Sequence, residues 1–156
     1  MAADLVLRRL GALDLDRAAA VHGESFAPLG ERAWTRQDLA GLLASPGVTG
    51  LLLQAEGRDV GVALCRVAAD ESELLTLAVR PTERRRGMGR RLLTAMIDRM
   101  REAGARALFL EVGADNPPAR RLYDAMGFQV IGTRPAYYRR GDAPPANALI
   151  MRLSLN

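Results

Sequence analysis

The first third of the chain alternates apolar and polar residues in patterns typical of one strand followed by two helices. Residues 4–10 fit the strand, and residues 12–25 have the spacing of an amphipathic helix with Leu13 near its apolar face. Thr35 and Asp38 have the spacing of a capping pair, which predicts a second helix from there to about residue 43.

Three strands follow, and their pattern is that of an antiparallel meander. Residues 48–56 and 60–69 flank a tight turn at 57–59, and a second turn leads into a strand over 73–79. This last strand is apolar on both faces, so we expect it at the centre of a sheet, under helices.

The rest of the chain alternates helix and strand and then ends in two strands. Residues 87–103 carry apolar side chains at helical spacing, and residues 107–112 are a two-faced buried strand. Asn116-Pro117 has the pattern of a helix N-cap followed by proline at the first helical position. Strands are expected over 128–134 and 148–153, joined by a polar loop.

The order of elements, β-α-α-β-β-β-α-β-α-β-β, predicts the fold class. It indicates an α/β protein with a mixed, mostly antiparallel central sheet of about seven strands, flanked by about four helices. Residues 73–112 form a β-α-β unit, whose two strands should be parallel with a right-handed crossover. The length of 156 residues fits a single domain over 1–156.

Composition excludes several classes of protein. With 49% hydrophobic and 26% charged residues, the chain is not a disordered, collagen-like or disulfide-stapled protein. It has no apolar run near the ~18–20 residues that cross a bilayer, and residues 1–4 carry no secretory signal. Cys65 and His22 are single and make no metal site, so we interpret both as structural and expect a cytoplasmic protein without a metal.

The positive charge is concentrated in one segment. All 22 basic residues are arginine, and residues 80–91 hold six of them against one glutamate, a local charge of +5 in a chain whose net charge is +4. The remaining residues therefore carry −1. A nucleic-acid or membrane surface would spread its charge more widely, so this pattern favours one compact polyanionic ligand, such as a nucleotide cofactor.

The same segment contains a glycine motif, Arg84-Arg85-Arg86-Gly87-Met88-Gly89-Arg90, between the buried strand and the long helix. Its two glycines permit a tight turn and close approach of the backbone to a ligand. The free amides and the dipole of a helix start favour phosphate. The motif is neither a Walker loop nor a dinucleotide fingerprint. A solvated basic loop is the alternative, and the concentrated charge favours phosphate binding.

Three further residues are candidates for chemistry. Glu111 stands at the carboxyl end of an otherwise apolar strand, where ligands bind in open α/β sheets, although a solvent-facing glutamate is the plainer interpretation. Asn116 fits a helix cap, and Tyr123 fits an ordinary core tyrosine whose hydroxyl needs a partner.

Together these elements resemble the GNAT acetyltransferase superfamily. The match comprises Leu77-Ala78-Val79, Arg84-x-x-Gly87-x-Gly89, Leu110-Glu111-Val112, Asn116 and Leu122-Tyr123-x-x-x-Gly127-Phe128. The glycine element fits the family's acetyl-CoA pyrophosphate motif, Gln/Arg-x-x-Gly-x-Gly/Ala. More narrowly, residues 73–153 resemble the ribosomal-protein-alanine N-acetyltransferases (RimI type), through the Glu–Asn–Tyr spacing, Tyr137-Tyr138 and the ending Ala148-Leu149-Ile150-Met151.

The resemblance implies the GNAT fold, acetyl-CoA as co-substrate and a set of roles. The backbone of Leu77, Ala78 and Val79 would pair with the pantetheine arm. The pyrophosphate would be cradled by Arg84, Arg85, Arg86, Gly87, Met88, Gly89 and Arg90. Asn116 would hydrogen-bond the cofactor, Glu111 would be the general base and Tyr123 the general acid.

The resemblance also implies the acceptor. It would be a protein N-terminus, possibly of a ribosomal protein and beginning with alanine, that enters between residues 26–34 and 137–142. The family usually has arginine directly after Leu-Glu-Val, where this chain has Gly113, and its early Phe-x-x-Pro-Trp stretch is altered, with Trp34 displaced. Peptide contacts would therefore be supplied differently here.

Two other functions stay open. One is acetylation of a small amine or a protein lysine by the same fold. The other is a non-catalytic CoA sensor or nucleic-acid-binding module. The presence of both Glu111 and Tyr123 argues against the sensor, and one Trp, three Tyr and three Phe are few for a base-stacking surface. We expect no membrane partner and no direct nucleic-acid partner.

Overall fold

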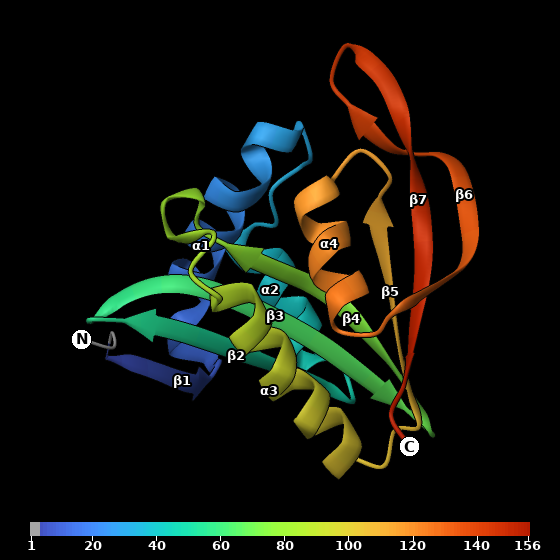
Figure 1. Cartoon of the computed structure of the whole chain (residues 1–156). Coiled ribbons are helices and arrows are strands. Elements are labelled where there is room, and N and C mark those ends of the chain that lie inside the picture. The colour runs from blue at the N-terminus through green and yellow to red at the C-terminus, as the bar shows by residue number, and fades with distance from the viewer. Residues whose placement is uncertain (1–3) are drawn as a thin grey trace.

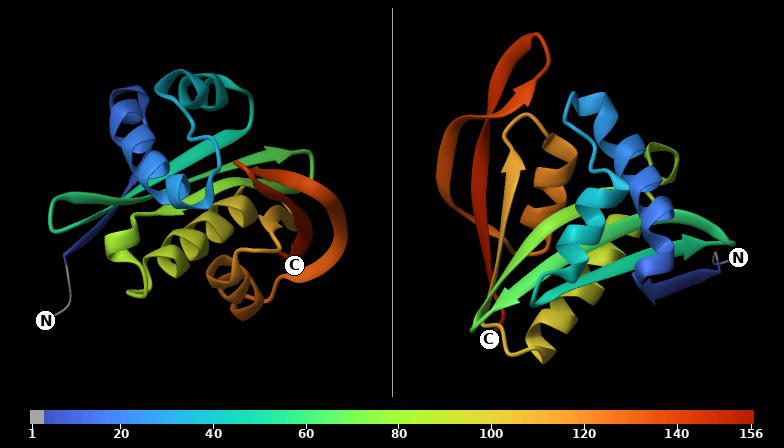
Figure 2. Two further views of the ribbon diagram at one scale, coloured as in Figure 1. Left: turned by 90° about the horizontal axis from the view of Figure 1, so that it is seen from above. Right: turned by 180° about the vertical axis from the view of Figure 1, so that it is seen from behind.

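A computed structural model describes residues 4–156 as a twisted sheet with helices on both faces (Figures 1 and 2). The strands are β1 (Leu5–Arg9), β2 (Val48–Ala55), β3 (Arg58–Ala68), β4 (Glu71–Val79), β5 (Ala107–Gly113), β6 (Gln129–Arg140) and β7 (Ala143–Ser154). The helices are α1 (Leu15–Phe26), α2 (Arg36–Ala44), α3 (Met88–Glu102) and α4 (Pro117–Ala125). Residues 1–3, part of the segment in which no secretory signal was expected, lie outside the described residues.

The predicted fold class is confirmed. The seven-stranded sheet has the order β1-β2-β3-β4-β5-β7-β6. Within residues 4–156, only β4 and β5 pair in parallel, as the β-α-β unit requires, and the other neighbours are antiparallel. Helices α1 and α2 cover one face and α3 and α4 the other (Figure 2).

Local sequence signals predicted most of the boundaries of the helices and strands. The predicted capping pair is present: the Asp38 amide donates to Thr35 Oγ1 at 3.1 Å, and the Thr35 amide donates to Asp38 Oδ2 at 2.8 Å. The apolar stripe of α3 is fully buried, as its spacing predicted, and consists of Leu92, Leu93, Met96, Ile97 and Met100. It packs into the larger of two core clusters, between the sheet and α3 and α4.

Two predictions about local structure were wrong. Leu13 is 97% exposed, because residues 12–14 form a tighter 3-10 turn and so fall out of phase with the helix that follows. Residues 135–147 are not a loop: β6 continues to Arg140, and β7 begins at Ala143. Pro144 and Pro145 fit at the start of β7 because β5 ends opposite Ala148. The first residues of β7 therefore have no neighbouring strand on that side to which an amide would have to donate.

The sheet opens between β4 and β5. These strands pair only where Glu71–Glu73 meets Ala107–Phe109, although both strands continue beyond that point. Directly after the paired stretch, the β3–β4 register skips one residue at Leu75, which is a β-bulge. A bulge bends and twists a strand, so β4 turns away from β5 and leaves a gap between their carboxyl-terminal halves.

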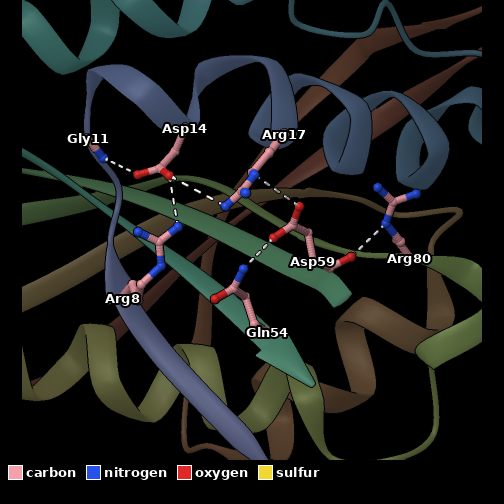
Figure 3. Close-up of polar contacts among 7 residues, drawn as sticks. All are labelled: Arg8, Gly11, Asp14, Arg17, Gln54, Asp59 and Arg80. Atoms are coloured by element: carbon pink, nitrogen blue, oxygen red, sulfur yellow. Dashed lines mark hydrogen bonds and ion pairs between the residues drawn. The ribbon is translucent and has the colours of Figure 1, made fainter. Parts of the chain in front are cut away.

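A polar network fixes Arg80, the residue before the arginine-rich loop (residues 81–90), to the sheet (Figure 3). It comprises Arg8, Gly11, Asp14, Arg17, Gln54, Asp59 and Arg80. Asp59 is its centre: its side chain accepts from Gln54 at 2.8 Å, and its backbone carbonyl accepts from Arg80 Nε at 2.7 Å. The position of Arg80, and of the loop after it, is therefore set by the β2–β3 turn.

His22 has a structural role, as expected. It is buried in α1, its Nδ1 accepts the Trp34 amide at 3.1 Å, and its ring stacks on Trp34 with centroids 4.7 Å apart. Burial lowers the pKa of His22 to about 4. The imidazole is therefore neutral in the folded chain near pH 7, and it ties Trp34 to α1.

This burial makes stability depend on pH. Below pH ~6.5 the unfolded chain protonates His22 while the folded chain does not, so the free energy of unfolding falls as the pH drops towards 4. The loss attributable to His22 is at most about 3 kcal/mol. In His22→Asn, which keeps an acceptor for the Trp34 amide, this component should disappear. Urea unfolding at several pH values between 7 and 4 measures it, and identical pH dependence in both proteins would refute it.

Candidate functional site

A cavity of about 690 Å³ lies where β4 and β5 separate. Residues from four segments line it: 25–29 at the end of α1, 77–79 in β4, 83–90 in the arginine-rich loop and 115–123 at the start of α4. Tyr123 and all but one of the residues predicted to bind the cofactor are among them. The exceptions among the predicted site residues are Arg86 and Glu111.

The arginine-rich loop presents unpaired backbone amides at the start of α3. Arg85 and Gly87 both have left-handed backbone, with φ of 65° and 78°, and Gly87 is the N-cap of the 15-residue helix. Within residues 4–156, the amides of 85–90 donate to no protein acceptor. Successive amides in such a turn form a concave anion site, and the helix dipole adds to it.

The glycines of the loop serve two different purposes. A Cβ on Gly87 would meet nothing within 4 Å, so this glycine supplies the left-handed conformation and leaves the space above the amides open. A Cβ on Gly89 would lie 3.3 Å from Leu122 Cδ2, so this glycine allows α4 to pack closely on α3.

Half of the arginines that make up the local charge of +5 have protein partners. Arg84 donates to the carbonyls of Ser25 at 3.0 Å and Val79 at 3.3 Å. Arg80 pairs with Glu24, and Arg86 pairs with Glu83 at 3.5 Å. These three arginines help to shape the loop, and Arg84 also lines the cavity, so the binding of one polyanionic ligand by this segment stays a prediction.

The cations available to a ligand are a smaller set. Arg85 and Arg90 line the cavity, and neither makes an ion pair in the part of the chain that is described. Arg121 of α4 also lines the cavity and was missed by sequence analysis. It lies one helical turn after Pro117, so the helical phase of α4 is the signal that could have placed it beside the helix start.

One edge of β4 is free along the cavity. Leu77, Ala78 and Val79 pair with residues 61–63 of β3 on one side, while the other side faces the gap. An extended ligand can add to such an edge as a further strand would.

Asn116 caps α4, which confirms the plainer of its two interpretations. Its side chain accepts from the Ala119 amide at 3.4 Å, and Pro117 and Pro118 occupy the first helical turn, where no amide is needed. It also lines the cavity, so its bond to the cofactor stays a prediction.

Tyr123 combines core packing with access to the cavity. The residue is 7% exposed, and its ring meets Phe128 edge to face with centroids 5.6 Å apart. Burial raises the pKa of Tyr123 above its usual range, with smaller contributions from Tyr138 and Cys65. The cavity is thus lined by a phenol that keeps its proton near pH 7.

Glu111 lies on the other side of β5. Leu108, Leu110 and Val112 pack into the core beneath α3 and α4, so the alternation of the strand turns Glu111 to the opposite face. There it lines a separate hollow of about 320 Å³ and pairs with Arg134 at 3.2 Å. Sequence analysis placed Glu111 and Tyr123 in one site, whereas in the structure they line two different hollows.

Tyr138 lies against Gly113 of β5: a Cβ on Gly113 would lie 3.6 Å from Tyr138 Cδ2. Gly113 stands two residues after Glu111, so Tyr138 lies on the face of β5 that carries Glu111. Burial raises the pKa of Tyr138, and the negative charges of Glu31 and Glu111 raise it further. Sequence analysis had noted Tyr138 only as part of a resemblance.

Comparison with known proteins identifies the family of this chain. The sequence model of the acetyltransferase (GNAT) family matches residues 14–128. The chain belongs to this family. Its members use acetyl-CoA, and this GNAT protein is an acetyl-CoA-dependent N-acetyltransferase. A member from Salmonella typhimurium, yncA, was solved with its cofactor acetyl-CoA; it is 21% identical, with a TM-score of 0.83 over 97% of this chain and 94% of the other, and shows the shared fold.

The narrower resemblance is also confirmed. The GNAT chain is 38% identical over 116 residues to the [ribosomal protein bS18]-alanine N-acetyltransferase of Haemophilus ducreyi, covering 73% of this chain and 80% of the relative. The crystal structure of the ribosomal-protein-S18-alanine N-acetyltransferase from Escherichia coli superposes with a TM-score of 0.89 at 29% identity, covering 98% and 95% of the two chains. Among residues 4–156 of this GNAT protein, none of the helices is long and apolar enough to cross a membrane.

Proposed function

We propose that this N-acetyltransferase moves the acetyl group of acetyl-CoA to the N-terminal amine of a protein that begins with alanine, such as a ribosomal protein. The observation that carries the proposal is the gap between β4 and β5. The cavity with free amides and a phenol lies along the free edge of β4, and the carboxylate of Glu111 is on the neighbouring strand β5. The relatives named as bS18-alanine N-acetyltransferases support the choice of acceptor.

The cofactor would lie along the larger cavity. Its pyrophosphate would accept from the amides of 85–90, with Arg85, Arg90 and Arg121 neutralising phosphate charge. Its pantetheine arm would pair with the free edge of 77–79, which directs the thioester towards the gap. Acetyl-CoA fits this site because the amides that would bind it have no other partner.

The transfer needs one proton removed and one supplied. The neutral amine nitrogen attacks the thioester carbonyl carbon, a C–N bond forms, and the C–S bond breaks to release the CoA thiolate. Glu111 would take the amine proton, directly or through a water. Tyr123 would protonate the thiolate sulfur. The Tyr123 phenol, whose ordinary pKa is ~10, lines the cavity and holds its proton near pH 7 until a thiolate forms beside it.

An N-terminal amine suits a single carboxylate base better than a lysine does. With a pKa of ~8, about a tenth of α-amines are neutral at pH 7, against roughly one lysine in a few thousand at a pKa of ~10.4. The base then has to remove only the proton of the attacking amine. The proposed reaction therefore needs no second base on the acceptor side.

The acceptor would reach Glu111 beside the aromatic pair of β6. Tyr137 and Tyr138 meet edge to face with centroids 5.1 Å apart, and Arg134 lies over the Tyr137 ring at 5.3 Å. These rings would narrow the space for the acceptor, so a first residue with a small side chain, such as alanine, would be favoured.

A comparison of matched peptides tests the acceptor. One peptide has a free N-terminal alanine and the first residues of a ribosomal protein bS18; the other is blocked at its N-terminus and carries one lysine. With labelled acetyl-CoA, we expect the free-alanine peptide to be the better substrate by kcat/KM. If the blocked lysine peptide or a simple polyamine is better, the acceptor is a lysine or a small amine, and the proposal is wrong.

A further inference from the structure

Arg140, the last residue of β6, joins three segments although it stands next to a hairpin turn. Its side chain is only 8% exposed. Nε and Nη2 donate to the two carboxylate oxygens of Asp115 at 2.8 and 2.9 Å, and Nη1 donates to Glu31 Oε1 at 2.8 Å. The guanidinium also lies over the Tyr138 ring, 5.0 Å from its centroid. We call Arg140 with Glu31 and Asp115 the Arg140 clasp.

The clasp spans the acceptor side of the molecule. Glu31 belongs to the segment between α1 and α2, and Asp115 lies in the turn between β5 and α4, so residues far apart in sequence meet at the tip of the β6–β7 hairpin (Figures 1 and 2). Backbone packing supports the same contact: a Cβ on Gly30 would lie 3.5 Å from the Arg140 carbonyl carbon.

Gly113 leaves the space that the clasp fills. A Cβ at this position would lie 2.6 Å from Arg140 Nη2 and 2.6 Å from Asp115 Oδ1. Its φ is not positive, so steric room rather than backbone conformation requires glycine here. The family usually has an arginine at the position of Gly113 in β5. In this chain the side chain of Arg140, which belongs to β6, occupies the space next to that position.

The geometry points to Arg140 as a positioning residue for the acceptor: it fastens the hairpin tip to the two neighbouring segments and holds Tyr138 against Gly113, two residues after Glu111 in β5. This inference rests on the proposed acetyl transfer to an N-terminal amine and adds the residue that shapes the acceptor side. Arg140 itself touches no reacting atom.

The electrostatics explain why the arrangement needs an arginine. Glu31 and Asp115 approach the same guanidinium, and without it two carboxylates would face each other with no cation between them. The planar fork of arginine satisfies both Asp115 oxygens and still has a donor for Glu31, which a lysine ammonium cannot match in geometry. Loss of the fork should free the hairpin tip and let Tyr138 move away from Gly113.

Kinetics of matched arginine variants test this role. Arg140→Gln should lower kcat/KM for the free-alanine peptide about tenfold or more, since small displacements of positioning groups have effects of this size. Its Kd for acetyl-CoA should stay within about threefold of the wild type, because the amides of 85–90 take no contact from the clasp. Arg140→Lys should recover part of the loss. Arg99→Gln, which removes the same charge from an exposed residue of α3 that lines neither cavity, should behave as the wild type.

Two measurements without acceptor keep this test separate from the proposed function. In Arg140→Gln, amide hydrogen exchange should speed up over residues 30–34 and 134–147, and not over 85–90. Gly113→Ala should lower the Tm by an amount on the order of 5 °C in the wild type and by clearly less in an Arg140→Ala background, because the two side chains compete for one space.

The outcomes separate the two proposals. If neither the wild type nor Arg99→Gln acetylates the alanine peptide, the proposed acceptor is wrong, and the clasp is judged by exchange and by the Tm values. If Arg140→Gln matches Arg99→Gln in kcat/KM and in exchange, or if the two Tm losses are additive, the inference about Arg140 is overturned.

Discussion

Glu111→Gln is expected to lower kcat by about 100-fold or more at pH 7 while leaving acetyl-CoA affinity nearly unchanged. The substitution keeps the size of the side chain and an oxygen for Arg134, and it removes the group that would accept the amine proton. Cofactor affinity should be spared because Glu111 does not line the larger cavity. Steady-state kinetics with the free-alanine peptide and calorimetry with acetyl-CoA measure the two quantities.

The pH dependence separates a base from a structural group. The loss in Glu111→Gln should shrink between pH 7 and pH 9, because an α-amine with a pKa of ~8 becomes neutral without help over this range. Glu73→Gln is the matched control: it removes an exposed carboxylate from the same hollow, and its kcat should stay within about twofold of the wild type. A loss that is independent of pH, or equal in the two variants, would rule out the base role of Glu111.

Replacement of Gly87 and Gly89 by valine is expected to abolish detectable acetyl-CoA binding. Valine at position 87 would have to adopt a φ near 78°, at a cost of about 1–3 kcal/mol, or the loop would change and the amides of 85–90 would lose their common direction. Valine at position 89 would press against Leu122 and displace α4, which carries Asn116 and Arg121. Calorimetry measures the affinity, and wild-type binding should also weaken with added salt.

A glycine elsewhere supplies the control for this double variant. Gly41 in α2 has an ordinary helical conformation and open space around it, so Gly41→Val adds the same side chain without strain and without reaching the cavity. It should keep wild-type affinity. Thermal melting of the double variant checks that the chain still folds, and affinity within about threefold of the wild type in a folded double variant would remove the phosphate site from 85–90.

The sequence by itself determined the features that depend on neighbours along the chain. The capping pair of Thr35 and Asp38, the buried stripe of α3 and the glycine spacing before that helix are local signals, and each element formed where its signal predicted. The order of these elements was enough for the mixed sheet with one parallel pair. Glycine spacing and local charge also pointed to one of the segments that line the cavity, residues 84–90, since a glycine-rich helix start favours anions in any surroundings.

Only the tertiary structure decided which partners the long polar side chains take. Arg84 and Arg86 stand in one motif, yet one binds backbone carbonyls and the other binds Glu83, and Arg121 enters the cavity from another helix. The separation of Glu111 from Tyr123 depends on which face of β5 each approaches, and the bond between Arg140 and Glu31 joins residues 109 positions apart. Such contacts depend on how packed elements meet in space. The pattern of neighbouring residues along the chain does not determine how those elements meet.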